Sequence, residues 1–253
     1  LFEGSIDSIN SFAIAKKTWE ILEKIRPETS IICDYSNIYG WISLLWAKKN
    51  KNDLIFWLAS TIDDKKHFFP KEQIKHFFLK HFHLYLAPGE KTKQYLEYMK
   101  VDSSKISITG YGVENSYYLQ EYDKHKNIIK ENLIKGISTN KHFLFVGRLS
   151  PEKNIISLLC AFNKVCHLNK NWGLIILGNG PQKNEIESYI LENKLEKRVH
   201  VIGYVQQDEI VKYYTFSDVF ILPSKSEPWG LVVNEAMLCS MPVIVSKRCG
   251  CYP

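Results

Sequence analysis

The chain has 253 residues, of which 45% are hydrophobic and 24% are charged, and its formal net charge at pH 7 is +6. These proportions are ordinary for a soluble globular protein, and the length is enough for one large or two ordinary domains. The positive charge is spread evenly along the chain, so it does not indicate a nucleic-acid partner.

The six cysteines form neither a CxxC pair nor a spacing suited to zinc. Several lie in apolar runs such as SLLCAF and AMLCS, which is typical of proteins in a reducing compartment. No apolar run approaches the length that spans a bilayer. We therefore expect a cytoplasmic protein, and we interpret the CGC segment at 249–251 as loop cysteines rather than as a redox pair.

Short and almost continuously apolar runs recur along the chain, separated by amphipathic segments such as 155–168 and 184–195. The runs lie at 30–34, 54–59, 84–88, 105–109, 143–147, 173–178, 199–203, 218–223 and 242–246. Strands of a parallel sheet covered by helices are apolar on both faces, as these runs are. The alternation of such strands with helices predicts an α/β protein with doubly wound parallel sheets.

The alternation stops between about residues 109 and 141, where the sequence is polar with one helical segment. We interpret this stretch as the connection between two Rossmann-like domains, 1–115 and 116–253, that face a cleft. The first half opens without the βα units expected at its start, and the second half stops in a loop after a strand. We therefore expect both domains to be truncated.

Two glutamates lie eight residues apart in the segment SEPWGLVVNEAM, Glu227 and Glu235. Pro228 disfavours helical backbone at Glu227 and suits the first turn of a helix, so Glu227 is predicted in a loop and Glu235 inside a largely buried helix. A buried carboxylate needs a hydrogen-bond donor. On the spacing alone two interpretations stay open: Glu227 caps the helix and Glu235 pairs with a lysine, or both bind a ligand with hydroxyl groups.

The helix that follows Pro228 is predicted to offer backbone N–H groups to phosphate or sugar oxygens. These groups belong to Trp229, Gly230 and Leu231. Gly230 also permits a close approach of the backbone to a ligand.

Two further segments follow predicted strands, where ligands of α/β sheets bind. VGRLSPEKN places Arg148 and Lys153 after one strand, and two cations suit a diphosphate. LGNGP places Gly178 and Gly180 after another strand, where we expect them to admit a ligand to the backbone. Each segment also fits an ordinary surface turn, and the third glycine of a dinucleotide fingerprint is missing.

Together the three segments resemble the retaining glycosyltransferases of family 4, which have the GT-B fold. The matching sequences are GRLSPEK at 147–153, GNGP at 178–181 and SKSEPWGLVVNEAM at 224–237. Their order and spacing are specific, and the clear match covers about 143–253. The first half matches more loosely, through LAPGEKTKQYL and YGVENSYY.

The resemblance implies roles for these residues in binding a nucleotide-sugar donor such as a UDP- or GDP-sugar. Arg148 and Lys153 would hold the diphosphate, and Glu235 would bind the ribose hydroxyls. Glu227 would contact hydroxyls of the donor sugar. Tyr204 and Val205 would lie near the base.

The chemistry that the resemblance implies is sugar transfer with retention at the anomeric carbon. Arg148 and Lys153 would stabilise the charge of the departing diphosphate, and Glu227 would bind hydroxyls rather than act as a nucleophile. The chain has no Asp-x-Asp motif, so we expect neither a metal nor another cofactor. Many family members carry a histidine in the segment that reads LAST here (58–61), so the acceptor chemistry is the least determined part.

The segment KKHFFPKEQIKHFFLKHFHLYL, residues 65–86, mixes lysines, histidines and phenylalanines. A helix from Pro70 would place Ile74, Phe77, Phe78 and Phe82 on one face. We interpret this face as core-facing; the alternative is peripheral contact with the inner face of a membrane, as a lipid-linked acceptor would require. His67 and the three histidines after it lack a metal-ligand spacing.

Two other functions would use the same fold. A non-catalytic subunit would bind a nucleotide sugar for a partner enzyme without turnover. A sugar-nucleotide epimerase would release an isomerised sugar nucleotide. The acceptor, carbohydrate or lipid-linked, is not specified by the sequence.

Overall fold

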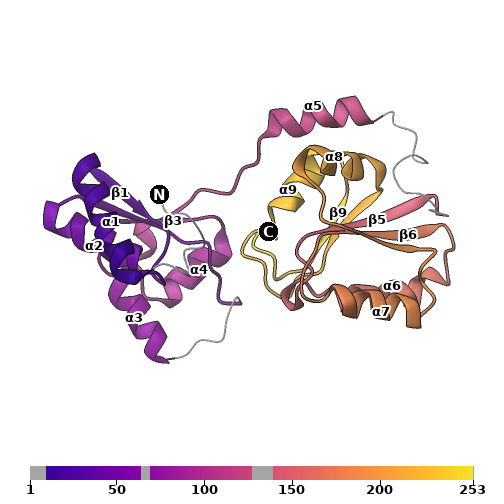
Figure 1. Ribbon diagram of the computed structural model, residues 1–253, viewed down its shortest axis with the longest axis horizontal. Helices are drawn as coiled ribbons and strands as arrows, with labels where there is room; N and C mark the ends of the chain where they lie inside the picture. Colours follow the sequence, from indigo (N-terminus) through magenta and orange to yellow (C-terminus); the bar gives the residue numbers. More distant parts are fainter. Residues whose placement is uncertain (1–9, 64–68, 127–138, 253) are drawn as a thin grey trace. The chain divides into compact units, whose positions relative to one another are not determined.

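A computed structural model describes residues 10–63, 69–126 and 139–252. The chain forms two compact units, Leu1–Gly110 and Tyr111–Pro253, each an α/β layer structure (Figure 1). The division falls after Gly110 rather than after residue 115, because helix α5 (Asn115–His125) and the residues before it pack on the second unit. His67 and its neighbours lie outside the described residues.

Unit 1 is a four-stranded parallel sheet in the order β1-β2-β3-β4. Its strands are β1 (Thr29–Ile32), β2 (Asp53–Trp57), β3 (Leu84–Ala87) and β4 (Ile106–Ile108). Its helices are α1 (Ser11–Ile25), α2 (Ile38–Asn50), α3 (Phe69–Leu79) and α4 (Glu90–Tyr98). Fully buried aromatic side chains of α2, β2 and α3 build its core, among them Trp46, Phe56 and Phe78.

Unit 2 is a five-stranded parallel sheet in the order β7-β6-β5-β8-β9. Its strands are β5 (Lys141–Val146), β6 (Trp172–Leu177), β7 (Val199–Gly203), β8 (Val219–Leu222) and β9 (Val243–Val245). Helices α6 (Ile155–Cys166) and α7 (Lys183–Glu192) cover one face of this sheet. Helices α5, α8 (Gln207–Phe216) and α9 (Leu231–Leu238) cover the other face (Figure 1).

The chain order reverses direction in the middle of the second sheet. From β5 it runs outward through β6 to β7, and then returns to the other side of β5 for β8 and β9. Loops at the carboxyl ends of β5 and β8 therefore diverge at a topological switch point, which is where open α/β sheets bind ligands.

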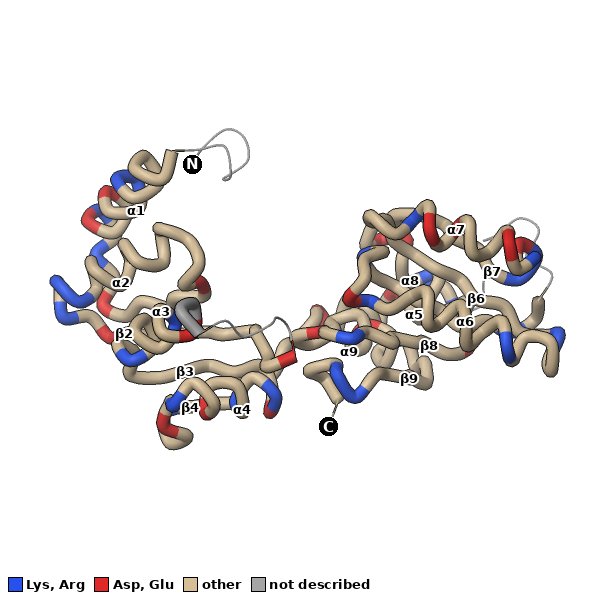
Figure 2. The backbone as a smooth tube through the Cα atoms, turned by 90° about the horizontal axis from the view of Figure 1, so that it is seen from below, with Lys and Arg blue, Asp and Glu red and all other residues tan. Residues whose placement is uncertain are grey.

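Strands lie at all nine predicted runs and both sheets are parallel, which confirms the α/β prediction. The reversal of strand order that marks a doubly wound sheet lies in unit 2. Lys and Arg are interspersed with Asp and Glu along the described parts of both units (Figure 2). Among the described residues, no helix combines the length and the apolar character that crossing a bilayer requires.

Candidate nucleotide-sugar site

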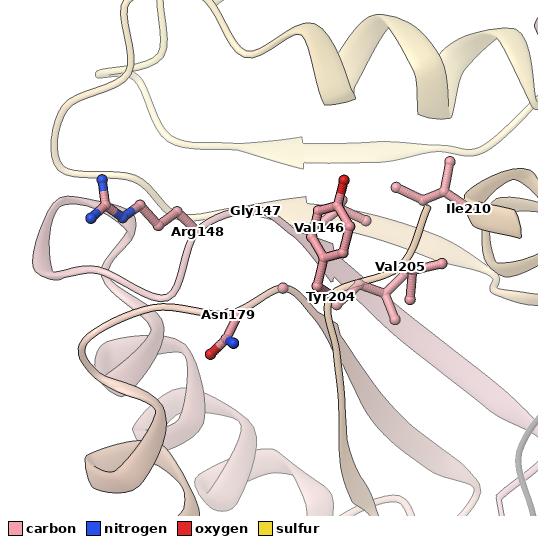
Figure 3. Close-up of a pocket in the computed structure, with 9 residues that line it drawn as sticks. Val146, Gly147, Arg148, Asn179, Tyr204, Val205 and Ile210 are labelled. Atoms are coloured by element: carbon pink, nitrogen blue, oxygen red, sulfur yellow. The ribbon is translucent and has the colours of Figure 1, made fainter. Parts of the chain in front are cut away.

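A pocket of about 300 Å³ lies in unit 2 at the carboxyl ends of β5, β6 and β7 (Figure 3). Four predicted site residues line it: Arg148, Gly178, Tyr204 and Val205. Sequence reasoning missed its other lining residues, which are Val146, Gly147, Leu177, Asn179 and Ile210. Four of these belong to segments that could have indicated them, Val146 and Gly147 to VGRLSPEKN and Leu177 and Asn179 to LGNGP. Ile210 belongs to neither segment.

The two ends of this pocket differ in character. The guanidinium of Arg148 extends from the turn after β5 at one end, away from Tyr204 (Figure 3). Tyr204, Val205 and Ile210 form an aromatic and aliphatic surface at the other end. Tyr204 is 71% exposed, so its ring is available for stacking. A ligand with a planar end and an anionic end would suit this arrangement.

Backbone hydrogen bonds join the three loops that form the pocket. The Gly147 N–H donates to the Leu177 carbonyl at 3.0 Å, and the Gly178 N–H donates to the Gly203 carbonyl at 2.7 Å. The Leu149 N–H donates to the Asn179 carbonyl at 3.0 Å. The sheet pairing thus continues past the strand ends and fixes the position of the Arg148 turn.

The structure requires glycine at positions 178 and 180 for a reason that differs from the predicted one. A Cβ on Gly178, whose φ is +140°, would lie 1.9 Å from the Gly147 carbonyl oxygen. A Cβ on Gly180 would lie 2.4 Å from the Leu149 carbonyl oxygen. Both glycines therefore admit the neighbouring loop of the protein itself, and only Gly178 also lines the pocket.

Gly178→Ala is expected to lower the free energy of unfolding by about 1–3 kcal/mol, because the methyl group collides with backbone and φ is unfavourable. Gly112→Ala is the matched control, since no atom lies within 4 Å of its added Cβ. Urea denaturation of both variants checks this expectation. Equal stability of Gly178→Ala and Gly112→Ala would contradict the steric explanation.

Lys153 and Glu227 pair directly across the switch point. Lys153 ends the 3₁₀ turn Pro151–Lys153 after β5, and Glu227 follows β8. The Lys153 ammonium donates a hydrogen bond to Glu227 Oε2, and their side chains are only 19% and 11% exposed. The two residues predicted to contact the diphosphate and the sugar are therefore partners of each other.

Glu152 shows that both predicted cations act on the same region. A hydrogen bond from the Ser150 hydroxyl lowers the pKa of Glu152, and the charges of Lys153 and Arg148 lower it further. Arg148 and Lys153 thus lie within electrostatic range of one carboxyl group. Arg148 is exposed to solvent whereas Lys153 is half-buried.

The loop that carries Glu227 is held by the loop after β9. Glu227 forms a parallel bridge with Cys249, and its carbonyl accepts the Gly250 N–H at 2.8 Å. Glu227 lies in a loop, as predicted, but the helix begins at Leu231 and not at Pro228. The reason is that Gly230 precedes it with φ at +98°, outside the helical region.

The side chain of Trp229 is committed to the fold of unit 2. Its indole N–H donates to Asn234 Oδ1 at 3.0 Å. Its ring meets that of Tyr111 edge-on, with the centroids 5.9 Å apart. Of the predicted stretch 229–231, the backbone rather than this indole remains the candidate for ligand contact.

Glu235 lies in α9, as predicted, and its donor is a tyrosine rather than a lysine. The Tyr214 hydroxyl donates to Glu235 Oε2 at 2.7 Å. No ion pair of Glu235 occurs within the described part of the chain. No motif marked Tyr214 in the sequence. Across the same residues, no three His, Cys, Asp or Glu side chains gather as metal ligands would.

Comparison with known proteins adds relatives along most of the chain. It is 27% identical over 223 residues to an alpha-monoglucosyldiacylglycerol synthase of Acholeplasma laidlawii, which covers 81% of this chain and 55% of that protein. It is 31% identical over 151 residues to an Escherichia coli UDP-Gal:alpha-D-GlcNAc-diphosphoundecaprenol alpha-1,3-galactosyltransferase, covering 58% of this chain and 38% of that one. The chain thus spans about half the length of the first of these relatives and less of the second.

Solved structures share the fold. HepE of Anabaena in complex with UDP superposes with a TM-score of 0.77 at 18% identity, over 94% of this chain and 64% of that one. Sucrose-phosphate synthase of Thermosynechococcus elongatus superposes with a TM-score of 0.74 at 19% identity, over 94% of this chain and 60% of that one. These likenesses confirm the predicted GT-B type of fold.

The family match rests on unit 2, which contains the pocket and both glutamates. Residues 125–253, just over half of the chain, match the family described as glycosyl transferases group 1. The chain therefore belongs to the glycosyl transferases group 1 family.

Proposed function

We propose that this protein transfers a sugar from a nucleotide-sugar donor to a carbohydrate or lipid-linked acceptor, with retention of the anomeric configuration. The observation that carries the proposal is the pocket at the strand ends of unit 2, with its cationic end at Arg148 and its aromatic end at Tyr204. The family membership of residues 125–253 supports it independently.

In this proposal the base of the donor lies against Tyr204, Val205 and Ile210, which form the apolar end of the pocket. The diphosphate lies toward Arg148, where the planar guanidinium can donate two parallel hydrogen bonds. A UDP- or GDP-sugar has this combination of a flat base and a diphosphate. The solved relative from Anabaena was crystallised with UDP, which supports a uridine nucleotide as the first probe.

The Lys153–Glu227 pair suggests how the donor sugar is bound. A diphosphate is a stronger partner for Lys153 than one carboxylate, so its arrival would draw the ammonium away from Glu227. Glu227 would then accept hydrogen bonds from hydroxyls of the sugar. This exchange links diphosphate binding to sugar binding through one half-buried ion pair.

The reaction itself would depend on electrostatic stabilisation. Negative charge grows on the diphosphate as the bond to the anomeric carbon breaks, and preorganised cations lower the energy of that state most. Arg148 and Lys153 would supply those charges. In this proposal Glu227 accepts hydrogen bonds from hydroxyls of the sugar and does not attack the anomeric carbon. The acceptor hydroxyl would form its bond to the anomeric carbon from the face that the diphosphate leaves, and the departing diphosphate would take up the hydroxyl proton. The configuration would therefore be retained.

Product analysis separates this proposal from its alternatives. The purified protein is incubated with UDP-, GDP- and ADP-sugars and with carbohydrate and lipid acceptors, and the products are identified by mass spectrometry and NMR. A transferred sugar with retained configuration supports the proposal. An inverted product would overturn retention, an isomerised sugar nucleotide would indicate an epimerase, and binding without turnover would indicate a non-catalytic subunit.

We also propose that unit 1 makes peripheral contact with a membrane. Ile74 and Phe77 on α3 are 55% and 50% exposed. The ring of Trp41, on α2, stacks on Phe77 with the centroids 6.4 Å apart, and the Lys80 ammonium lies 4.2 Å from the Phe77 ring centroid. An exposed apolar surface edged by lysine suits the interface of an anionic bilayer.

Replacing both Ile74 and Phe77 with serine is expected to reduce binding to vesicles of equal parts phosphatidylglycerol and phosphatidylcholine by roughly ten-fold. The reason is that two apolar side chains that would be partly buried in the bilayer are lost. The matched control replaces Ile31 and Ile108, which are 55% and 52% exposed in the same unit. Sedimentation with vesicles measures both. Equal binding of the two double variants would contradict a role for this surface.

A further inference from the structure

The carboxylate of Glu235 is held by a buried tyrosine of a neighbouring helix. Tyr214 lies on α8 and is 0% exposed, and its hydroxyl donates to Glu235 Oε2 at 2.7 Å. Burial, followed by the nearby charge of Glu235, raises the pKa of Tyr214 well above its ordinary value. The phenol therefore keeps its proton at neutral pH and remains a hydrogen-bond donor.

The other groups around Glu235 are neutral as well. Burial raises the pKa of Tyr118, on α5, and the charge of Glu235 raises it further. Burial and the same charge raise the pKa of the Cys239 thiol to about 12. Within the described residues no lysine or arginine forms an ion pair with Glu235. The carboxylate is thus oriented by neutral groups that leave its charge uncompensated.

This environment differs from that of the other glutamate of the segment. Glu227 is paired with a cation, Lys153, which a diphosphate could take over. Glu235 has no such partner to exchange. A carboxylate has lone pairs for about four hydrogen bonds. The bond from Tyr214, with the Tyr118 hydroxyl also close to Glu235, therefore leaves acceptor capacity for a pair of hydroxyl groups.

We propose that Tyr214 is a positioning residue that aims the Glu235 carboxylate at the ribose diol of the donor nucleotide. The inference rests on the proposed function, because it takes a nucleotide to be bound in unit 2 with its ribose at Glu235, the role that the family resemblance implies for this residue. Tyr214 acts only through Glu235, since its side chain is fully buried and its hydroxyl is bonded to the Glu235 carboxylate. It therefore contributes to recognition of the ribose hydroxyls and not of the base or the diphosphate.

The test compares nucleotides with and without the diol. Dissociation constants are measured by calorimetry for UDP, GDP and ADP and for their 2′,3′-dideoxy forms. Tyr214→Phe is expected to weaken binding of the ribonucleotide roughly ten-fold, the scale of losing a hydrogen bond to a charged group. It is expected to leave binding of the dideoxy form unchanged. Tyr213→Phe, which changes the preceding residue of α8, is the matched control. It should change neither the affinity for the ribonucleotide nor that for the dideoxynucleotide.

A second variant keeps the inference testable if Tyr214→Phe folds poorly. Glu235→Gln retains the shape of the side chain, removes its charge and should abolish the preference for the diol. In that background Tyr214→Phe should cause no additional loss. Thermal unfolding of each variant shows whether it is folded.

The outcomes separate this inference from the proposed function. If the unmodified protein binds none of the nucleotides, the proposed function fails and this inference fails with it. If it binds ribonucleotide and dideoxynucleotide equally well, the ribose role of Glu235 is wrong while nucleotide binding stands. If Tyr214→Phe weakens both forms equally, or neither, Tyr214 is a structural residue and the inference is overturned.

Discussion

Lys153→Ala is expected to reduce the rate of sugar transfer by roughly 10²–10³-fold, the typical cost of removing one group that stabilises developing charge. It is also expected to destabilise unit 2, because Glu227 would remain buried without its partner. Breaking a fully buried ion pair by removing one member costs about 3–5 kcal/mol, which is the upper bound for this half-buried pair. Lys153→Ala is therefore expected to lower both activity and stability.

A double variant separates the two effects of Lys153. Lys153→Met combined with Glu227→Gln removes both charges, so stability should recover while transfer remains lost. Lys212→Ala is the control, because Lys212 forms a surface pair with Glu209 at 2.6 Å and such pairs contribute little. Urea denaturation and transfer rates measure the series. Recovery of transfer in the double variant would contradict a role for Lys153 in the reaction.

Arg148→Ala is expected to slow transfer by roughly 10²–10³-fold while weakening nucleotide binding by less than about ten-fold. The difference follows if the guanidinium interacts more strongly with the diphosphate as charge develops on it. Arg148 is exposed at the end of the pocket, so its removal leaves no buried charge and the free energy of unfolding should stay within about 0.5 kcal/mol of the original.

Comparing kinetics with binding decides the role of Arg148. Single-turnover rates give the loss in the chemical step, and calorimetry gives the loss in affinity. Arg148→Lys keeps the charge without the planar guanidinium. Its transfer rate should therefore lie between those of the unmodified protein and Arg148→Ala. Equal losses in rate and affinity would show that Arg148 only anchors the donor in the ground state.

The strands were predictable because a parallel sheet with helices on both faces demands side chains that are apolar on both sides. Runs such as FLFV and LIIL in β5 and β6 meet this demand within a few consecutive residues. The positions of Arg148 and Glu227 at strand ends followed from the same pattern. This part of the fold is encoded locally, and local patterns were sufficient to find it.

The partners within the site were not predictable, because they are distant in sequence. Lys153 is 74 residues from Glu227, and Tyr214 is 21 residues from Glu235 on a different helix. No spacing rule connects such pairs. The structural role of Gly178 could not be predicted either. A glycine allows close approach of a neighbouring loop or of a ligand for the same reason, which is that it lacks a side chain.

The aromatic segment of unit 1 shows where periodicity reaches its limit. Ile74, Phe77, Phe78 and Phe82 were predicted to share a core-facing side. Phe78 and Phe82 are buried with Leu79, whereas Ile74 and Phe77 remain half exposed. Periodicity identifies an apolar face but does not fix where the helix ends. Helix α3 ends at Leu79, so Phe82 joins the core from the turn that follows the helix.

The most direct test of a nucleotide-sugar site in unit 2 is calorimetric titration with UDP, GDP and ADP and their sugars. It should be made on the 253-residue chain and on the longest reading frame that contains it. We expect at least one nucleoside diphosphate to bind with one-to-one stoichiometry, and Tyr204→Ala and Arg148→Ala each to weaken it. Failure of every nucleotide to bind the folded protein, or binding that neither substitution alters, would contradict the site.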